Sequence, residues 1–297
     1  MPSPIEAAPD EAPRYQVGVR ELCEFVAKQG DLDLRFTPTP TAQEGIAGHA
    51  LVAARRPAGY QSEVTLSGQH GLLNVKGRAD GYHPHLNRVE EVKTHKGPAD
   101  AIPANHRHLH WAQAKVYGAL LCRERGLAHI DVALVYFEVG TQKETVLCER
   151  HSAAELEAHF IEVCERFTAW AERELAHRRA RDASLTTLTF VHPQFRAGQR
   201  ELAESVYKAA ATGRCLLAQA PTGIGKTIGT VFPLLKACPT QRLDKVFFLT
   251  AKTSGRAAAL HAIAKLRAHA PSLRLRELEL RAREKACEHP DRACHGQ

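Results

Sequence analysis

The sequence lacks a run of about 18 apolar residues, the length a helix needs to cross a membrane. Residues 1–14 are rich in proline and acidic side chains and contain no apolar segment, which argues against a secretion signal and for a short leader without fixed structure. We therefore expect a cytoplasmic protein that makes no use of a membrane.

Closely spaced cysteine pairs are also missing, because the eight cysteines are scattered singly along the chain. In a chain without an export signal this pattern predicts reduced thiols and excludes a disulfide framework. No internal repeat is present, so a solenoid architecture is not expected either.

Charge is present but unevenly distributed within a net formal charge of +7. Residues 183–297 contain 18 Lys and Arg against 8 Asp and Glu, whereas residues 1–182 contain 22 against 25. The basic second part suits a polyanionic partner such as DNA, although a solvated basic surface explains the charge equally well.

Apolar periodicity predicts an α/β domain over residues 15–182. Helices are expected over residues 19–29, 42–56, 106–125 and 152–181, and strands over 62–67, 72–80, 88–94, 130–139 and 145–150. Beyond a boundary at 182–188, helices over 199–211, 227–236 and 255–269 alternate with strands over 215–218 and 245–250. This alternation is typical of a parallel α/β sheet.

Three charged residues on neighbouring predicted strands suggest a metal site. Asp80 ends one strand, and Glu91 and Lys93 share one face of the next, because strand side chains alternate. Two carboxylates beside an ammonium can bind Mg²⁺ or Mn²⁺, orient water and stabilise charge on an attacked phosphate. Taken alone, these residues are equally consistent with exposed charge on an ordinary sheet.

Two further motifs extend the series. Gly45 and His49 lie on the preceding predicted helix, while Gln113 and Tyr117 share one face of the following helix. The order G-x-x-x-H, G-x-x-D, E-x-K, Q-x-x-x-Y over residues 19–138 resembles the RecB-like branch of the PD-(D/E)XK nucleases.

The resemblance implies a restriction-endonuclease-like fold, in which helices flank a mixed central sheet, and an enzyme that cuts DNA. Its metal ligands would be His49, Asp80, Glu91 and the carbonyl of Val92. Lys93 would position the water and stabilise the transition state, and Gln113 and Tyr117 would orient the site and contact DNA. The four cysteines of this region, Cys23, Cys122, Cys148 and Cys164, lack the spacing of the cluster that some relatives carry.

His106, His108 and His110 alternate beside Arg107 and Trp111 near the start of a predicted helix. Successive positions on a helix splay around its axis, so we expect a solvated surface here rather than a metal site.

Residues 220–227, Ala-Pro-Thr-Gly-Ile-Gly-Lys-Thr, lie between a predicted strand and a predicted helix and read as a phosphate-binding loop. Backbone N–H groups of Thr222, Gly223 and Gly225 would cradle the phosphates of ATP. Lys226 would reach the outer phosphates, and Thr227 would hold Mg²⁺.

The stretch from Phe195 to Thr253 resembles superfamily 2 helicases of the DinG and XPD group, although Gln219 stands where that group commonly has an acidic residue. The resemblance implies a RecA-like motor domain, with Gln199 as adenine reader and Thr250 and Lys252 as DNA contacts. That group also inserts a [4Fe–4S] domain, and Cys287 and Cys294 would be its first two ligands. Zinc held by these cysteines with His289 and His295 is the alternative.

An acidic second motor strand, a second motor domain and an arginine finger are absent from the sequence. We therefore expect this polypeptide to bind nucleotide and DNA without hydrolysing ATP at a useful rate or unwinding DNA, and to hold no complete cluster. The sequence reads as the N-terminal part of an ATP-dependent DNA helicase fused to a metal-dependent DNA nuclease of DNA repair. A DNA-binding module without catalysis and an RNA-directed enzyme remain the alternatives.

Overall fold

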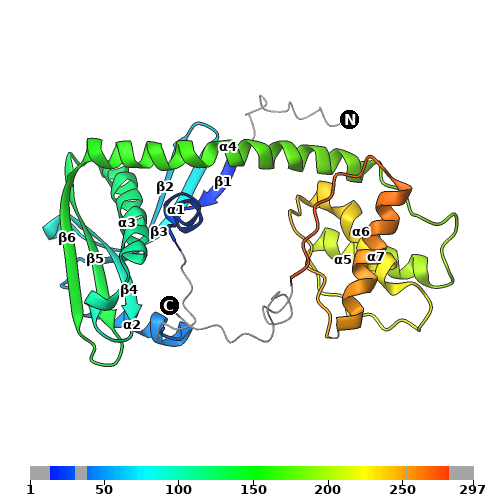
Figure 1. Ribbon diagram of the computed structural model, residues 1–297, viewed down its shortest axis with the longest axis horizontal. Helices are drawn as coiled ribbons and strands as arrows, with labels where there is room; N and C mark the ends of the chain where they lie inside the picture. Colours follow the sequence, from blue (N-terminus) through cyan, green and yellow to red (C-terminus); the bar gives the residue numbers. More distant parts are fainter. Residues whose placement is uncertain (1–13, 31–38, 252, 281–297) are drawn as a thin grey trace, which may run out of the picture. The chain divides into compact units, whose positions relative to one another are not determined.

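The computed structural model describes residues 14–30, 39–251 and 253–280. The chain separates into two compact units, divided between Glu172 and Arg173 inside the long helix α4 (Ala153–Thr186) (Figure 1). The predicted boundary at residue 182 lies in the same helix. None of the described helices combines the length and apolar character that a membrane span requires.

The first unit is built on one mixed six-stranded sheet (Figure 1). Its strands are β1 (Tyr15–Gly18), β2 (Gln61–His70), β3 (Leu73–His83), β4 (Arg88–His95), β5 (His129–Glu138) and β6 (Glu144–Ser152). Pairing is parallel between β1 and β3 and between β4 and β5, and antiparallel elsewhere. This α/β architecture of a mixed central sheet with flanking helices agrees with the sequence expectation.

Strand β3 pairs with β2 along one edge and with two different strands, β1 and β4, along the other. On that second edge β1 pairs with residues 73–76, and β4 pairs with residues 81–83. Residues 77–80 have no strand beside them on this edge within the described sheet. The sheet is therefore split next to Asp80.

Helices cover both faces of the sheet. Val52 of α2 (Ala42–Ala54) packs against Val92, Val135 and Phe137 on one face. The opposite face carries α3 (Ala104–Arg125), where Gly118 lies against Val132. Helix α1 (Val19–Ala27) packs on α3, and the 3-10 turns Pro84–Leu86 and Ala99–Ala101 lie in the connections.

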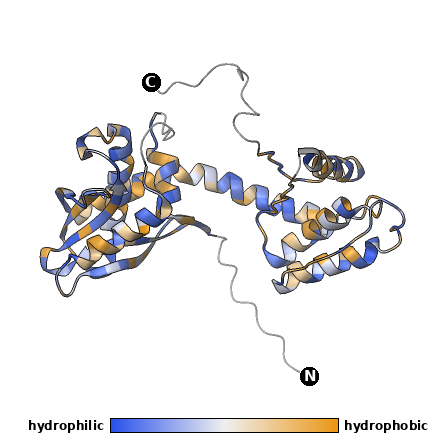
Figure 2. Cartoon of the chain, turned by 90° about the horizontal axis from the view of Figure 1, so that it is seen from below, coloured by the Kyte–Doolittle hydropathy of each residue, from blue (hydrophilic) through white to orange (hydrophobic). Residues whose placement is uncertain are grey.

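All nine elements predicted for the first unit are present, with ends that differ by a few residues. The largest shift is at α4, predicted over 152–181 and observed to Thr186. Figure 2 shows hydrophilic and hydrophobic bands alternating along this helix. Ser152 accepts from the Glu155 N–H and the Glu155 carboxylate accepts from Ser152, which is the capping box that the sequence predicts.

The described part of the second unit is helical. Its helices α5 (Gln199–Thr212), α6 (Lys226–Gln241) and α7 (Thr253–His269) follow the end of α4 (Figure 1). They enclose a small core formed by Leu185, Leu188, Val231, Leu235, Cys238, Leu266 and Leu273.

The two strands predicted here were wrong. Residues 215–218 and 245–250 are irregular, with Leu217 fully exposed and Phe247 73% exposed, and the described residues of this unit contain no strand. A short apolar run becomes a strand only when a neighbouring strand accepts its backbone hydrogen bonds. Since neither run pairs with the other, the described residues of the second unit form no parallel sheet.

Candidate functional site

A cavity of about 550 Å³ opens at the split between β3 and β4. Every residue that the four nuclease-like motifs predicted for the site lines it: His49, Asp80, Glu91, Val92, Lys93, Gln113 and Tyr117. Sequence spacing thus identified a set of side chains that the fold brings to one place from α2, β3, β4 and α3.

Asp80 bridges the split in the sheet with its side chain. The Val92 N–H donates to Asp80 Oδ2 over 2.7 Å, where a strand carbonyl would otherwise accept it. The N–H and C=O of one strand residue lie on the same edge, so the Val92 carbonyl also faces the split. The Val92 side chain points into the apolar layer beneath α2, as alternation predicted.

His49 approaches Asp80 from α2, with its Nδ1 lying 3.1 Å from Asp80 Oδ1. This hydrogen bond raises the pKa of His49, because it favours the imidazolium form. Gly48 permits the approach, since a Cβ there would lie 2.5 Å from Thr94 Cγ2. Thr41 and Glu44 fix the start of α2 with reciprocal capping hydrogen bonds.

Glu91 and Lys93 form a buried ion pair on the face covered by α3. Lys93 Nζ donates to Glu91 Oε1 over 2.7 Å and to Gln113 Oε1 over 3.0 Å. Burial raises the pKa of Glu91, with the opposing attraction of Lys93 as the next cause. Burial also raises the pKa of Tyr117 above its ordinary value.

Gly77, three residues before Asp80, lets two helices close on the site. A Cβ at this position would lie 2.6 Å from Val19 Cγ2 of α1 and 2.7 Å from Tyr117 Cε1 of α3. The glycine of the G-x-x-D motif therefore serves close packing, and it brings Arg20, the neighbour of Val19, to the cavity wall.

The donor set suits a hard cation in its chemistry, because two carboxylates and a carbonyl converge on one split. Their oxygens are engaged by protein groups: Asp80 with His49 and the Val92 N–H, and Glu91 with Lys93. The described residues contain no group of three or more His, Cys, Asp or Glu side chains arranged around a metal position. A metal would thus have to displace part of these contacts.

A second buried carboxylate, that of Glu90, is the centre of a hydrogen-bonded cluster that the sequence analysis did not predict. It is fully buried on the face opposite Glu91, where it accepts hydrogen bonds from Arg56, Arg88 and Tyr60. Arg56 follows the end of α2, so this cluster ties the helix that carries His49 to the strand that carries Glu91. Sequence offered one signal for it, the adjacent Glu90-Glu91 pair on an alternating strand.

Two arginines, Arg20 and Arg78, line the same cavity and were also missed. They come from α1 and β3, outside the motif positions. The predicted histidine surface is partly wrong: His108 is exposed, but His110 is largely buried and lies 3.0 Å from the Tyr136 hydroxyl. Burial lowers the pKa of His110 to about 3.

In the second unit, the loop before α6 contains two glycines in the left-handed region of backbone conformation. Gly223 and Gly225 adopt φ of 86° and 82°, values that favour glycine. Lys226 begins α6, and its Nζ donates back to the carbonyls of Ala220 and Pro221 over 2.9 and 3.2 Å. Thr222 and Gly223 are exposed, and Thr227 is half-buried in the first turn of the helix.

Gln199, predicted to read adenine, is almost fully buried beneath this loop. Its Oε1 accepts from the Arg196 N–H over 3.1 Å, and its Nε2 donates to the Gly225 carbonyl over 3.2 Å. The structure therefore gives the amide a role in holding the loop. Arg196 adds a hydrogen bond to the Gly223 carbonyl.

Of the remaining predicted contacts of this unit, Thr250 alone lies among the described residues. Thr250 is exposed in an irregular segment and packs beside Gly255. Lys252, Cys287 and Cys294 lie outside the described residues, as do His289 and His295 of the zinc alternative.

Comparisons with known proteins identify no family for the chain. No protein-family profile matches the chain, and no curated protein matches it. Among solved structures, one described as "Crystal structure of SSO0001" is similar at 17% identity and a TM-score of 0.35, covering 56% of this chain and 79% of that one. A likeness this weak carries no argument about chemistry, so the function must be inferred from the residues of the cavity.

Proposed function

We propose that the first unit is a Mg²⁺- or Mn²⁺-dependent nuclease of the PD-(D/E)XK type, similar to the RecB-like branch, that cuts DNA phosphodiesters. One observation carries the proposal: residues of four separate motifs, in the order typical of that branch, line a single cavity at a split in the sheet. A chance set of polar residues spread over 69 positions of sequence has no physical reason to meet.

The chain's own residues would divide the chemistry among them. Asp80, Glu91 and the Val92 carbonyl would hold the ion, which supplies a Lewis acid for the phosphate and lowers the pKa of bound water. The Lys93 ammonium lies at the same carboxylate and would stabilise negative charge that develops on the phosphate. Gln113 holds Lys93 in place through its amide oxygen.

The test is cleavage of labelled single-stranded DNA with Mn²⁺ or Mg²⁺ by the wild type and by Glu91→Ala and Lys93→Ala. We expect both substitutions to reduce the rate by at least about 10²-fold, since each removes an electrostatic contribution to the transition state. If all three proteins bind DNA and none cuts it, the unit is a DNA-binding module. An RNA strand of the same sequence, tested side by side, distinguishes the RNA-directed alternative.

For the second unit we propose ATP binding by the loop 220–227, as part of a superfamily 2 helicase of the DinG and XPD type. The loop's two left-handed glycines and the lysine at the start of α6 support this assignment. Phosphates would replace the carbonyls of Ala220 and Pro221 as partners of Lys226.

Titration with a fluorescent ATP analogue tests the second proposal. Lys226→Ala should weaken binding by about tenfold or more, because it removes a charge-assisted contact to phosphate. We expect no DNA-stimulated ATP hydrolysis from this polypeptide, and a robust ATPase would contradict that expectation. Together, a DNA-cutting unit and a nucleotide-binding unit suggest a role in DNA repair.

A further inference from the structure

The cavity of the first unit holds more positive charge than its four motifs require. Besides Lys93, two arginines line it: Arg20 on α1 and Arg78 on β3. Neither belongs to a motif position, and α1 contributes no motif residue at all. Their presence in the wall of an acidic site calls for a physical reason.

A nucleic-acid strand is a polyanion, and the carboxylates of Asp80 and Glu91 repel it. The motif residues His49 and Lys93 partly offset this repulsion, but each is engaged with one of these carboxylates and offers no free positive charge to a phosphate. His49 pairs with Asp80 at 3.1 Å, and Lys93 pairs with Glu91 at 2.7 Å. A cation that attracts phosphate must therefore come from another residue of the wall.

Of the two arginines, Arg20 is the less engaged. Arg78 forms an ion pair with Glu63 at 2.5 Å across neighbouring strands. Arg20 faces Glu24 one helical turn away, but the separation is 3.8 Å and 75% of the Arg20 side chain is exposed. Exposed pairs of this kind contribute little to stability, so a phosphate displaces the carboxylate at little cost.

The position of Arg20 is fixed even though its head group is exposed. Val19 is 1% exposed and packs against Gly77, which has no side chain to hold α1 away from β3. Gly77 and Asp80 belong to the same strand, so the contact that seats α1 also sets the distance between Arg20 and the acidic site. Arg20 thus lines the same cavity as Asp80 and Glu91, and its guanidinium is a fork suited to phosphate.

We propose that Arg20 binds the DNA phosphate next to the one held over Asp80 and Glu91, and so anchors the strand while it is cut. This inference rests on the proposed nuclease function. It assigns strand binding to α1, an element that the motif series leaves without a role.

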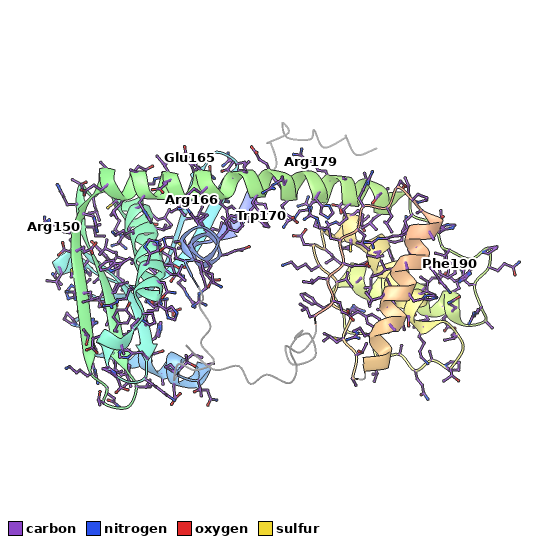
Figure 3. All side chains as sticks on the ribbon, viewed as in Figure 1. Arg150, Glu165, Arg166, Trp170, Arg179 and Phe190 are labelled. Atoms are coloured by element: carbon purple, nitrogen blue, oxygen red, sulfur yellow. The ribbon has the colours of Figure 1, made fainter. Side chains whose placement is uncertain are left out.

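Arg166 offers a matched control. It lies on α4 (Figure 3), it faces Glu162 one turn away at the same 3.8 Å, and 58% of its side chain is exposed. It does not line the cavity. Arg20→Ala and Arg166→Ala therefore remove the same kind of charge from the same kind of ion pair, at different places.

The experiment measures binding of a fluorescent single-stranded oligonucleotide to the full chain in EDTA over a range of salt, and cleavage kinetics in Mn²⁺. For Arg20→Ala we expect about tenfold weaker binding and a loss of about 0.7 from the slope of log K against log salt. KM should rise while kcat changes little, because the contact exists before and during the reaction. Arg20→Lys keeps the positive charge but loses the two-pronged guanidinium, so its DNA affinity should lie between those of the wild type and Arg20→Ala.

The inference is wrong if Arg20→Ala, like Arg166→Ala, binds the oligonucleotide with the affinity and the salt dependence of the wild type. The nuclease proposal survives that result if the wild type cuts DNA and Glu91→Ala does not. Conversely, if the wild type does not cut DNA but Arg20→Ala weakens DNA binding, the nuclease proposal is wrong and the phosphate contact of Arg20 is confirmed. Equal melting temperatures of the variants exclude misfolding as the cause.

Discussion

At the scale of single residues, the ion pair between Glu91 and Lys93 determines how much stability a substitution at either residue costs. Both side chains are largely buried, so removing one leaves an uncompensated charge in the protein interior. We expect Lys93→Met to lower the free energy of unfolding by about 3 kcal/mol. Urea denaturation of the wild type and the variant measures the loss.

The double variant Glu91→Gln with Lys93→Met supplies the control. Because it removes both charges, it should regain most of the stability that Lys93→Met loses, although neither protein should cut DNA. Equal stability of the single and double variants would mean that the two charges are not coupled in the folded protein.

His110 makes stability depend on pH. Burial holds its pKa at about 3, below the ordinary value near 6.5, so the folded state resists protonation more than the unfolded state does. The unfolded chain therefore gains protons first as the pH falls, and stability is lost below about pH 6.5. From pH 7 to pH 5 the loss from this group is about 2 kcal/mol.

Denaturation of the wild type and of His110→Phe at both pH values measures this contribution. The phenyl ring fills the imidazole's space without titrating, although it forfeits the contact with the Tyr136 hydroxyl. The variant should consequently lose about 2 kcal/mol less than the wild type on acidification. An unchanged loss would assign the acid sensitivity to other groups.

Sequence reasoning found the motif residues of the cavity but neither its two arginines nor the contacts among its side chains. Spacing places Glu91 and Lys93 on one face, since strand alternation is a local rule. The contacts of Glu90 with Arg56 and Tyr60, by contrast, depend on where the end of α2 meets β4. The position of the end of α2 against β4 is fixed by tertiary packing, which the local sequence periodicity does not predict.

At the scale of elements, Gly77 controls how closely α1 and α3 approach β3. Gly77→Ala puts a Cβ within 2.7 Å of both Val19 and Tyr117. The two helices must shift, which should cost about 2 kcal/mol of stability and also weaken DNA binding by moving Arg20. Thermal unfolding and oligonucleotide titration would record both effects.

Gly140→Ala is the matched control, because its Cβ would meet nothing closer than the Glu138 carboxylate at 3.4 Å. It should leave stability within about 0.5 kcal/mol of the wild type. If Gly77→Ala is equally mild, the helices have room to move and the glycine has no packing role.

The same scale explains the failed strand predictions in the second unit. Residues 245–250 and 215–218 have the apolar character of buried strands, but their exposure shows that character alone does not form a sheet. In the first unit, β5 has the same apolar character and forms a strand because β4 pairs with it over eight residues. Local pattern predicts the tendency to form a strand, and a pairing partner decides the outcome.

At the scale of the whole molecule, the two candidate sites draw on separate parts of the chain. The residues that line the nuclease-like cavity lie before position 118, and the contacts of the phosphate loop lie between Arg196 and Gly229. The division of the chain between Glu172 and Arg173 falls between these sets. No described residue belongs to both sites.

Sites that share no partner residue usually behave additively, so the two activities should be separable by mutation. Lys226→Ala should weaken nucleotide binding by about tenfold or more yet leave the rate of DNA cleavage within about twofold of the wild type. Glu91→Ala should do the reverse. Cleavage that rises or falls more than fivefold when ATP is added to the wild type, and not to Lys226→Ala, would instead reveal a coupling free energy of about 1 kcal/mol between the units. In that case nucleotide binding to the second unit would change the cleavage activity of the first unit, and the two activities would not be independent.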